Sequence, residues 1–195
     1  MNINLLFEEM EHYAKENNVP IMLKEGINYL TNFVKDKGIK NILEVGTAIG
    51  YSTIKLRNEG CSITSIERDI ERYKLAKDNV KKSGFDNINL IFGDALDVEI
   101  SNLYDLIFID AAKGKNIDFI NKFKDNLKDN GYIIIDNVDF HGLVGNSDKI
   151  KSRNLRSLVR KIEKFLDYLD NQGEFIVEKV SVGDGLIILT RRGNE

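Results

Sequence analysis

Glycine and acidic residues stand at the ends of three successive short apolar runs in this chain. Gly46 follows the first run, Glu67 the second and Asp94 the third. Glycines let the backbone turn tightly and approach a ligand, and the start of the next helix offers free N–H groups. An acid about twenty residues beyond such a loop commonly holds a ribose diol, and Asp94 is suited to accept from an adenine amino group. Together the three positions favour a site for an adenosine-containing ligand.

The spacing of glycines in the segment Glu44–Gly50 argues against two other kinds of ligand site. It does not fit G-x-G-x-x-G, which is typical of dinucleotide binding, and no Gly-Lys-Ser/Thr follows it as in a phosphate-binding loop. The acidic Glu44 would repel a phosphate but can pair with an ammonium group. A simpler interpretation stays open, in which the segment is only a turn and Glu67 is a surface acid. Asp69 is the better candidate for a helix N-cap.

Three oxygen-bearing side chains follow two later apolar runs. Asp110 comes after one run, and Asp136 and Asn137 come after the other. Oxygen ligands suit a hard cation such as Mg²⁺, which keeps water or substrate in its remaining positions. Lys113 lies three residues beyond Asp110, and a neighbouring dication and partial desolvation would both lower its pKa, which makes it a candidate base. The alternatives are solvated or capping aspartates and an ordinary surface lysine.

Short, wholly apolar runs that alternate with helical patterns predict the elements carrying these residues. Strands are expected at 41–45, 61–66, 88–92, 104–109, 132–135, 175–180 and 186–190, and helices at 3–16, 24–36, 51–58, 70–83, 117–129 and 153–171. The alternation is typical of a parallel sheet covered on both faces, and the turn Gly183–Gly185 makes the last two strands an antiparallel hairpin. We therefore expect an α/β, Rossmann-like fold with a seven-stranded, mostly parallel sheet. Its ligand site should lie beyond the carboxyl ends of the strands.

The amino-acid composition is typical of a globular protein. Its 195 residues suit one domain, with an N-terminal helical extension at 1–38 and a core at 39–195. The net charge of -3 excludes a polycation, and the single cysteine, Cys61, excludes a disulfide scaffold. The first residues lack the apolar run of a secretory signal, and no stretch approaches the roughly 18 to 20 apolar residues of a membrane span. A cytoplasmic protein without membrane contact is expected.

At these motifs the chain resembles the metal-dependent class I S-adenosylmethionine O-methyltransferases, the group of the catechol and caffeoyl-CoA O-methyltransferases. The resemblance covers nearly the whole chain, and its markers are the segments Ile42–Ser52, Ile66–Asp69, Gly93–Ala95, Phe108–Lys113 and Asp136–Val138. It implies the class I methyltransferase fold, S-adenosylmethionine as cofactor, and Mg²⁺ or another divalent cation.

The resemblance also implies roles for particular residues. The cofactor would be held by Met22, Glu44, Gly46, Thr47, Ala48, Tyr51, Ser52, Glu67, Asp94, Ala95 and Asp110; the metal by Asp110, Asp136 and Asn137; and catalysis would fall to Lys113 with Asp110. One departure is Ala111–Ala112, where the animal catechol enzymes carry bulkier residues, so a catechol-shaped wall is not assured. The group is commonly dimeric, which implies a homodimer in which the extra N-terminal helices serve an interface.

Within this group the chain is most similar to the short bacterial branch that methylates 5-hydroxyuridine at the tRNA wobble position, giving 5-methoxyuridine. The segments Asn17–Met22, Asp136–Val144 and Val182–Gly185 carry that similarity. A tRNA substrate needs a basic surface, and residues 141–170 hold seven Lys or Arg against four acids. Arg153 and Arg156, one helical turn apart, are the candidate contacts. The alternative is that they belong to a solvated helix face.

Two other functions stay open at the level of sequence. A small-molecule O-methyltransferase acting on vicinal diols, catechol-like or caffeoyl-CoA-like, would use the same core and metal. A cofactor-binding protein without transfer activity belongs to a different class, and the complete set of Asp110, Lys113, Asp136 and Asn137 disfavours it.

Overall fold

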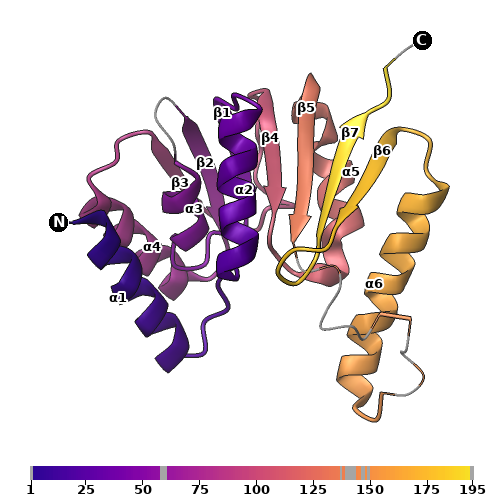
Figure 1. The fold of residues 1–195 in the computed structure, drawn as a ribbon, viewed down its shortest axis with the longest axis horizontal. Helices are drawn as coiled ribbons and strands as arrows, with labels where there is room; N and C mark the ends of the chain where they lie inside the picture. Colours follow the sequence, from indigo (N-terminus) through magenta and orange to yellow (C-terminus); the bar gives the residue numbers. More distant parts are fainter. Residues whose placement is uncertain are drawn as a thin grey trace.

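A seven-stranded sheet with the order β3-β2-β1-β4-β5-β7-β6 forms the centre of the computed structural model (Figure 1). The model describes residues 2–57, 61–136, 138, 144–145, 148 and 150–193. The strands are β1 (Asn41–Val45), β2 (Ser62–Glu67), β3 (Ile88–Phe92), β4 (Tyr104–Ile109), β5 (Leu127–Asp136), β6 (Phe175–Val180) and β7 (Leu186–Arg191). The helices are α1 (Ile3–Glu16), α2 (Lys24–Asp36), α3 (Tyr51–Leu56), α4 (Ile70–Ser83), α5 (Asn116–Phe123) and α6 (Arg153–Asn171), with short 3-10 turns η1 (Lys113–Lys115) and η2 (Lys124–Asn126).

Strand pairing confirms the predicted topology. β1 runs parallel to both β2 and β4, while β7 runs antiparallel to β5 and β6. From β1 the chain builds outward through β2 to β3, and it then crosses back to β4 on the other side of β1. This reversal at β1 and β4 is the place where open α/β sheets bind ligands.

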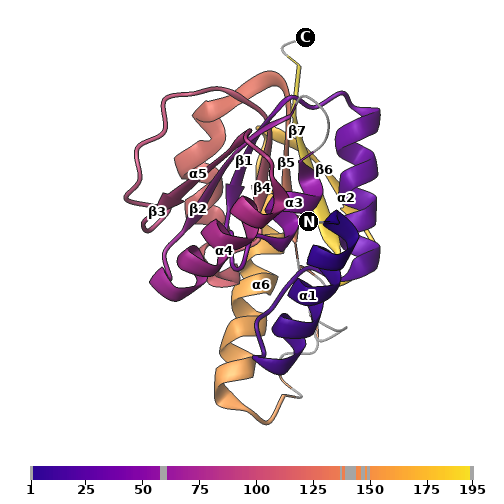
Figure 2. The same ribbon diagram turned by 90° about the vertical axis from the view of Figure 1, so that its left-hand side faces the viewer.

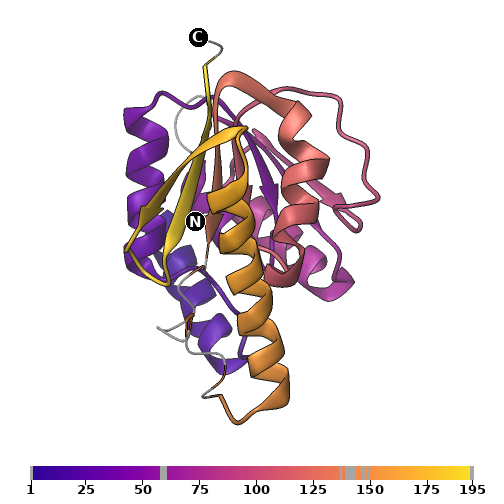
Figure 3. The same cartoon turned by 90° about the vertical axis from the view of Figure 1, so that its right-hand side faces the viewer.

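The alternation of side chains along the strands divides the core into two layers. Ile42, Phe108 and Ile134 face the layer of α1, α2 and α3, and Leu75 and Val80 of α4 pack against the same cluster. Leu43, Ile107 and their neighbours face the layer of α5 and α6 instead. Viewed along the sheet, α2 and α5 lie on opposite sides of it (Figures 2 and 3). Each face is therefore covered, as wholly apolar strands require.

The largest departure from the predicted boundaries lies between α5 and β5. A helix was expected to continue to residue 129, but α5 ends at Phe123 and β5 begins at Leu127. The buried Leu127 pairs with Tyr104 of β4, and the register then shifts before Leu106 pairs with Tyr132. Long-range pairing thus draws the segment into the sheet against its helical pattern.

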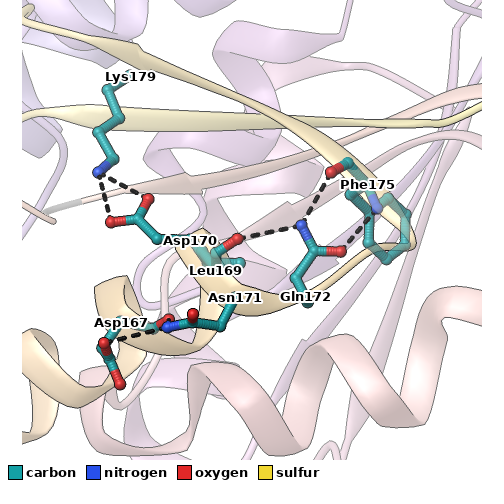
Figure 4. Close-up of polar contacts among 7 residues, drawn as sticks. All are labelled: Asp167, Leu169, Asp170, Asn171, Gln172, Phe175 and Lys179. Carbon is teal, nitrogen blue, oxygen red and sulfur yellow. Dashed lines mark hydrogen bonds and ion pairs between the residues drawn. The ribbon is translucent and has the colours of Figure 1, made fainter.

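The connection from α6 to the edge strand β6 is held by a single amide side chain. Gln172 Oε1 accepts a hydrogen bond from the Phe175 N–H at 2.7 Å, and Gln172 Nε2 donates to the carbonyls of Phe175 at 2.8 Å and Leu169 at 3.2 Å (Figure 4). The amide therefore supplies partners to the peptide groups at which α6 stops and β6 starts.

Among the described residues, no helix is long and apolar enough to cross a membrane.

Candidate active site

A cavity of about 550 Å³ opens beyond the carboxyl ends of β1, β2, β3 and β4. Residues from the predicted site that line it are Gly46, Ala48, Glu67, Asp94, Ala95, Asp110 and Lys113. The cavity is also lined by residues to which the sequence analysis gave no site role, namely Pro20, Ile21, Arg72, Lys115, Phe119 and Asp184. The topology thus gathers residues from distant segments at one edge of the sheet.

Gly46 lets the loop after β1 pass between its neighbours. Its N–H donates to the Ile66 carbonyl at 3.0 Å, and its φ is 102°. A Cβ at this position would lie 2.1 Å from the carbonyl oxygen of Asp110. Only glycine fits here, because both the space and the backbone conformation exclude a side chain.

Glu67 stands at the end of β2 with both carboxylate oxygens oriented by backbone donors. Oε2 accepts from the Ala48 N–H and Oε1 from the Asp69 N–H, each at 2.8 Å. A carboxylate oxygen has lone pairs for more than one donor, so Glu67 can also accept hydroxyl donors from the cavity. The predicted N-cap role of Asp69 is confirmed, since its Oδ1 accepts from the N–H groups of Glu71 and Arg72.

Asp94 is the corresponding acid after β3. Its Oδ1 accepts from the Leu96 N–H at 3.0 Å, and its Oδ2 lies 3.8 Å from an Arg68 nitrogen. This pair is exposed and weak. The turn therefore fixes the Asp94 carboxyl at the cavity wall without using all of its accepting capacity.

Glu44 lies beneath the glycine loop rather than on the cavity wall. It is fully buried, and its carboxyl accepts hydrogen bonds from Ser52 Oγ at 2.6 Å, Ser65 Oγ at 2.5 Å and Thr53 Oγ1. Thr47 joins the same network through Ser65, at 2.6 Å. Burial raises the pKa of Glu44 to about 7, although the three hydroxyl donors act in the opposite direction. The predicted set Glu44, Thr47 and Ser52 thus supports the loop from below.

Met22 and Tyr51 line a second cavity of about 360 Å³. Pro20 and Ile21 belong to both cavities, so the segment between α1 and α2 is the wall that separates them. The Tyr51 hydroxyl donates to Glu11 Oε1 at 2.7 Å. Burial raises the pKa of this tyrosine, and the carboxylate of Glu11 adds to the effect.

Lys113 lines the main cavity and interacts electrostatically with three carboxylates. The pairing of Ile109 with Ile135 brings Asp110 and the buried Asp136 to adjacent strand ends, while Asp184 comes from the turn before β7. Burial lowers the pKa of Lys113 below its ordinary value, and the charges of Asp110, Asp136 and Asp184 oppose this shift without cancelling it. The site position of Asp184 could have been predicted from the turn Gly183–Gly185. The antiparallel hairpin places that turn at the same edge of the sheet as the carboxyl ends of the parallel strands.

The predicted metal ligands are placed only in part. Asp110 and Asp136 share the strand ends just described, whereas Asn137 lies outside the described residues. Within the described part of the chain, no group of three or more His, Cys, Asp or Glu side chains forms a cluster that could hold a metal ion. The two aspartates still offer the oxygen donors that a hard dication prefers, at a position where a cationic ammonium is already accommodated.

The two predicted RNA contacts differ in their surroundings. Arg156 Nε and Nη2 both donate to the Ile150 carbonyl, at 2.8 and 2.5 Å, which ties the guanidinium to the segment before α6. Arg153 is exposed at the first position of α6. Arg160 pairs with Asp148 at 2.9 Å. The structure therefore gives Arg156 a local structural contact and leaves Arg153 on the surface.

The strand order, with β7 inserted antiparallel between β5 and β6, defines the class I methyltransferase fold. The chain belongs to the O-methyltransferase family, whose profile matches residues 3–192. It is accordingly an S-adenosylmethionine-dependent O-methyltransferase.

Individual relatives support this assignment. The caffeoyl-CoA O-methyltransferase of Stellaria longipes is 25% identical over 165 residues, which span 78% of this chain and 68% of the relative. A crystal structure of a "putative caffeoyl-CoA O-methyltransferase" from Staphylococcus aureus has 33% identity and a TM-score of 0.89, and covers 95% of this chain and 92% of that one. The O-methyltransferase from Bacillus cereus in complex with SAH (S-adenosylhomocysteine) has 25% identity and a TM-score of 0.80, with 96% and 90% covered.

Proposed function

We propose that this enzyme methylates the 5-hydroxyl of 5-hydroxyuridine at the tRNA wobble position, with S-adenosylmethionine in the main cavity and Mg²⁺ beside the acceptor. The observation that carries the catalytic part is Lys113, which lines the main cavity with Asp110 and Asp184 and also interacts electrostatically with Asp136. A base of lowered pKa beside oxygen ligands is suited to deprotonate a hydroxyl.

The tRNA assignment is supported by where the similarity to the tRNA-modifying branch falls. Pro20 and Ile21 of the segment 17–22 line the main cavity, and so does Asp184 of the segment 182–185. Gly183 lies against the residues that follow the first segment, since a Cβ at Gly183 would be 3.4 Å from the Gly26 nitrogen and 3.7 Å from the Leu23 Cβ. Residues of these two segments therefore lie on the wall of the proposed site, where acceptor choice would be made, whereas most of the third segment, 136–144, lies outside the described residues.

The lining fits the cofactor. When bound, S-adenosylmethionine supplies an electrophilic methyl group. Gly46 lets the loop after β1 turn against the backbone of Asp110 at the cavity wall, and the oriented carboxyl of Glu67 is placed to accept from ribose hydroxyls. Asp94 and Ala95 would border the adenine end of the cavity. These residues hold and orient, so they contribute chiefly by bringing the two reactants together in the geometry of attack.

The acceptor end performs the proton chemistry. Asp110 and Asp136 would hold Mg²⁺ with Asn137, and the bound ion would supply positive charge that acidifies a neighbouring hydroxyl. Lys113 Nζ is the group on this chain that would take or steer the proton. Because burial already disfavours its charged form, the amine would be present to a greater extent than for a surface lysine.

A small-molecule O-methyltransferase acting on vicinal diols is the second candidate. The Stellaria longipes relative is named for caffeoyl-CoA, and Arg156 is occupied by the Ile150 carbonyl instead of facing an incoming phosphate. Both observations favour a small-molecule acceptor over a tRNA. The same cavity and the same carboxylates would serve this reaction.

A methyl-transfer assay with labelled S-adenosylmethionine and Mg²⁺ distinguishes the candidates. The acceptors are tRNA from cells lacking this gene, a catechol and caffeoyl-CoA. Label in 5-methoxyuridine that disappears with a chelator is expected. Label only in the diols would replace the tRNA assignment by the second candidate, and transfer that survives the chelator would refute the role of the metal.

Variants at the acceptor end test the assigned roles. Asp110→Asn and Asp136→Asn should abolish transfer but retain binding of S-adenosylhomocysteine in calorimetry. Lys113→Met should lower kcat by about 10² to 10⁴, the usual share of a general base, with little change in cofactor affinity. Lys81→Met, at an exposed position in the last turn of α4, is the control. An unchanged kcat for Lys113→Met would exclude the lysine as base.

A further inference from the structure

The N-terminal helix α1 docks directly on α3, the helix that follows the glycine loop. The rings of Phe7 and Tyr51 meet edge to face with centroids 6.0 Å apart. Lys55 Nζ lies 3.8 Å from the centroid of the Phe7 ring, a cation–π geometry. Glu11 adds the hydrogen bond from the Tyr51 hydroxyl at 2.7 Å. Aromatic, cationic and polar contacts thus join the two helices.

The same carboxylate reaches a third element. Glu11 Oε2 pairs with Nζ of Lys24, the first residue of α2, at 2.8 Å. The side chain of Glu11 is only 26% exposed, whereas that of Lys24 is 71% exposed. Burial alone would raise the pKa of Glu11, but the hydrogen bonds from Lys24 and Tyr51 and the neighbouring charges outweigh it, so the pKa lies below its ordinary value. Glu11 is therefore held as a carboxylate that joins α1, α2 and α3.

These contacts enclose the segment 17–23, which connects α1 to α2. Pro20 and Ile21 of this segment line the main cavity. The segment is anchored at its start by the Val19 N–H, which donates to the Ala14 carbonyl at 2.9 Å. At its end it is anchored by the pairing of Lys24 with Glu11. The position of the cavity wall is thus fixed from outside the cavity, by a residue that does not line it.

We propose that Glu11 is a positioning residue for the cofactor: by linking Tyr51 to Lys24, it holds the segment 17–23 against the main cavity and slows cofactor release. The inference rests on the proposed function in that the main cavity takes S-adenosylmethionine. It assigns no chemistry to Glu11. Its effect should therefore appear in cofactor affinity and residence time and not in the methyl-transfer step.

The test compares Glu11→Ala, Glu11→Gln and Lys24→Met with Glu9→Gln, a control on an exposed position of α1. S-Adenosylhomocysteine release is measured by competition in stopped flow, KM and kcat by methyl transfer, and folding by urea unfolding. Glu11→Ala should raise KM for S-adenosylmethionine and the release rate about five- to tenfold, the effect of losing one hydrogen bond of ordinary net strength. The kcat at saturating cofactor should change less than about twofold. Glu11→Gln retains an acceptor for Tyr51 and loses the ion pair, so an intermediate effect is expected.

A double variant distinguishes an effect of the Glu11–Lys24 ion pair on cofactor release from a general loss of stability. If Glu11 acts through Lys24, adding Lys24→Met to Glu11→Ala should accelerate release little beyond Glu11→Ala alone. Unchanged release in Glu11→Ala, or the same acceleration in Glu9→Gln, would overturn the role of Glu11. Failure of the wild type to bind S-adenosylhomocysteine would overturn the proposed cofactor site itself. If Glu11→Ala does not fold, Glu11→Gln and Lys24→Met decide the question.

Discussion

The buried carboxyl of Glu44 should make the stability of this protein depend on pH in an unusual direction. Burial raises its pKa from the ordinary 4.5 to about 7. Between these two values the folded protein binds a proton that the unfolded chain has released, so the free energy of unfolding falls as the pH rises. The stabilisation is fully present below 4.5 and is lost by the time the pH passes about 7. Most paired carboxylates act in the opposite sense.

The size of this loss in unfolding free energy follows from the difference between the two pKa values. From 4.5 to about 7, at about 1.4 kcal/mol for each pH unit, the loss is about 3 kcal/mol. No reduction for solvent screening applies, because Glu44 is 0% exposed. Glu44→Gln keeps the size of the side chain and removes its titration. The difference in unfolding free energy between wild type and Glu44→Gln should therefore decrease by about 3 kcal/mol between pH 4.5 and pH 8.

Urea unfolding of the cofactor-free protein at several pH values measures this difference. Subtracting the variant removes the contributions of all other titrating groups that are common to both proteins. A difference that stays constant within about 1 kcal/mol would refute the raised pKa. A difference that increases with pH would mean that the hydroxyl donors Ser52, Thr53 and Ser65 outweigh burial, so that the carboxylate is stabilised in the fold.

Two further substitutions test the backbone at the site and at the α6–β6 connection. Gly46→Ala should lower the free energy of unfolding by about 3 kcal/mol or more in urea unfolding, since the new Cβ meets a carbonyl oxygen that follows β4. Gly38→Ala, where φ is 62° but nothing lies within 4 Å, should show only the left-handed strain of about 1 to 2 kcal/mol; equal losses would disprove the steric argument. Gln172→Ala should lower the same quantity by about 1 to 3 kcal/mol, because it removes the side-chain partners of the first peptide group of β6. Lys164→Ala, at an exposed position of α6, should stay within about 0.5 kcal/mol, and a similar loss there would contradict the role of the Gln172 amide.

Strand-end residues were predictable from the sequence because topology alone brings them together. Once 41–45, 61–66 and 104–109 are read as parallel strands, Gly46, Glu67 and Asp110 must meet at one edge. The boundary at Leu127 was not predictable in this way. Its pairing with Tyr104 joins residues far apart in the chain, and the local pattern carries no sign of that partner.

The direction of a side chain was harder to predict than its position. Glu44 lies near the carboxyl end of β1, as predicted. The two-residue alternation of a strand places its side chain with that of Ile42 on the face beneath α3, where Ser52 and Thr53 donate hydrogen bonds to it. The cofactor role implied for it by resemblance therefore competes with a supporting role that the geometry offers. Strand parity was available in the sequence and points to the second role.

Contacts between elements carry the remaining information, and Glu11 shows why a motif cannot supply it. From the sequence alone, a glutamate in an amphipathic helix is predicted to be solvated, because helical spacing indicates only which face of the helix is apolar. Its partners Tyr51 and Lys24 lie on two other elements, whose relative positions exist only after the sheet has formed. Motif residues determine what the cavity can bind, whereas residues such as Glu11 determine how firmly its wall is held. Substitutions of the first kind should abolish transfer, and those of the second kind should change how long the cofactor stays.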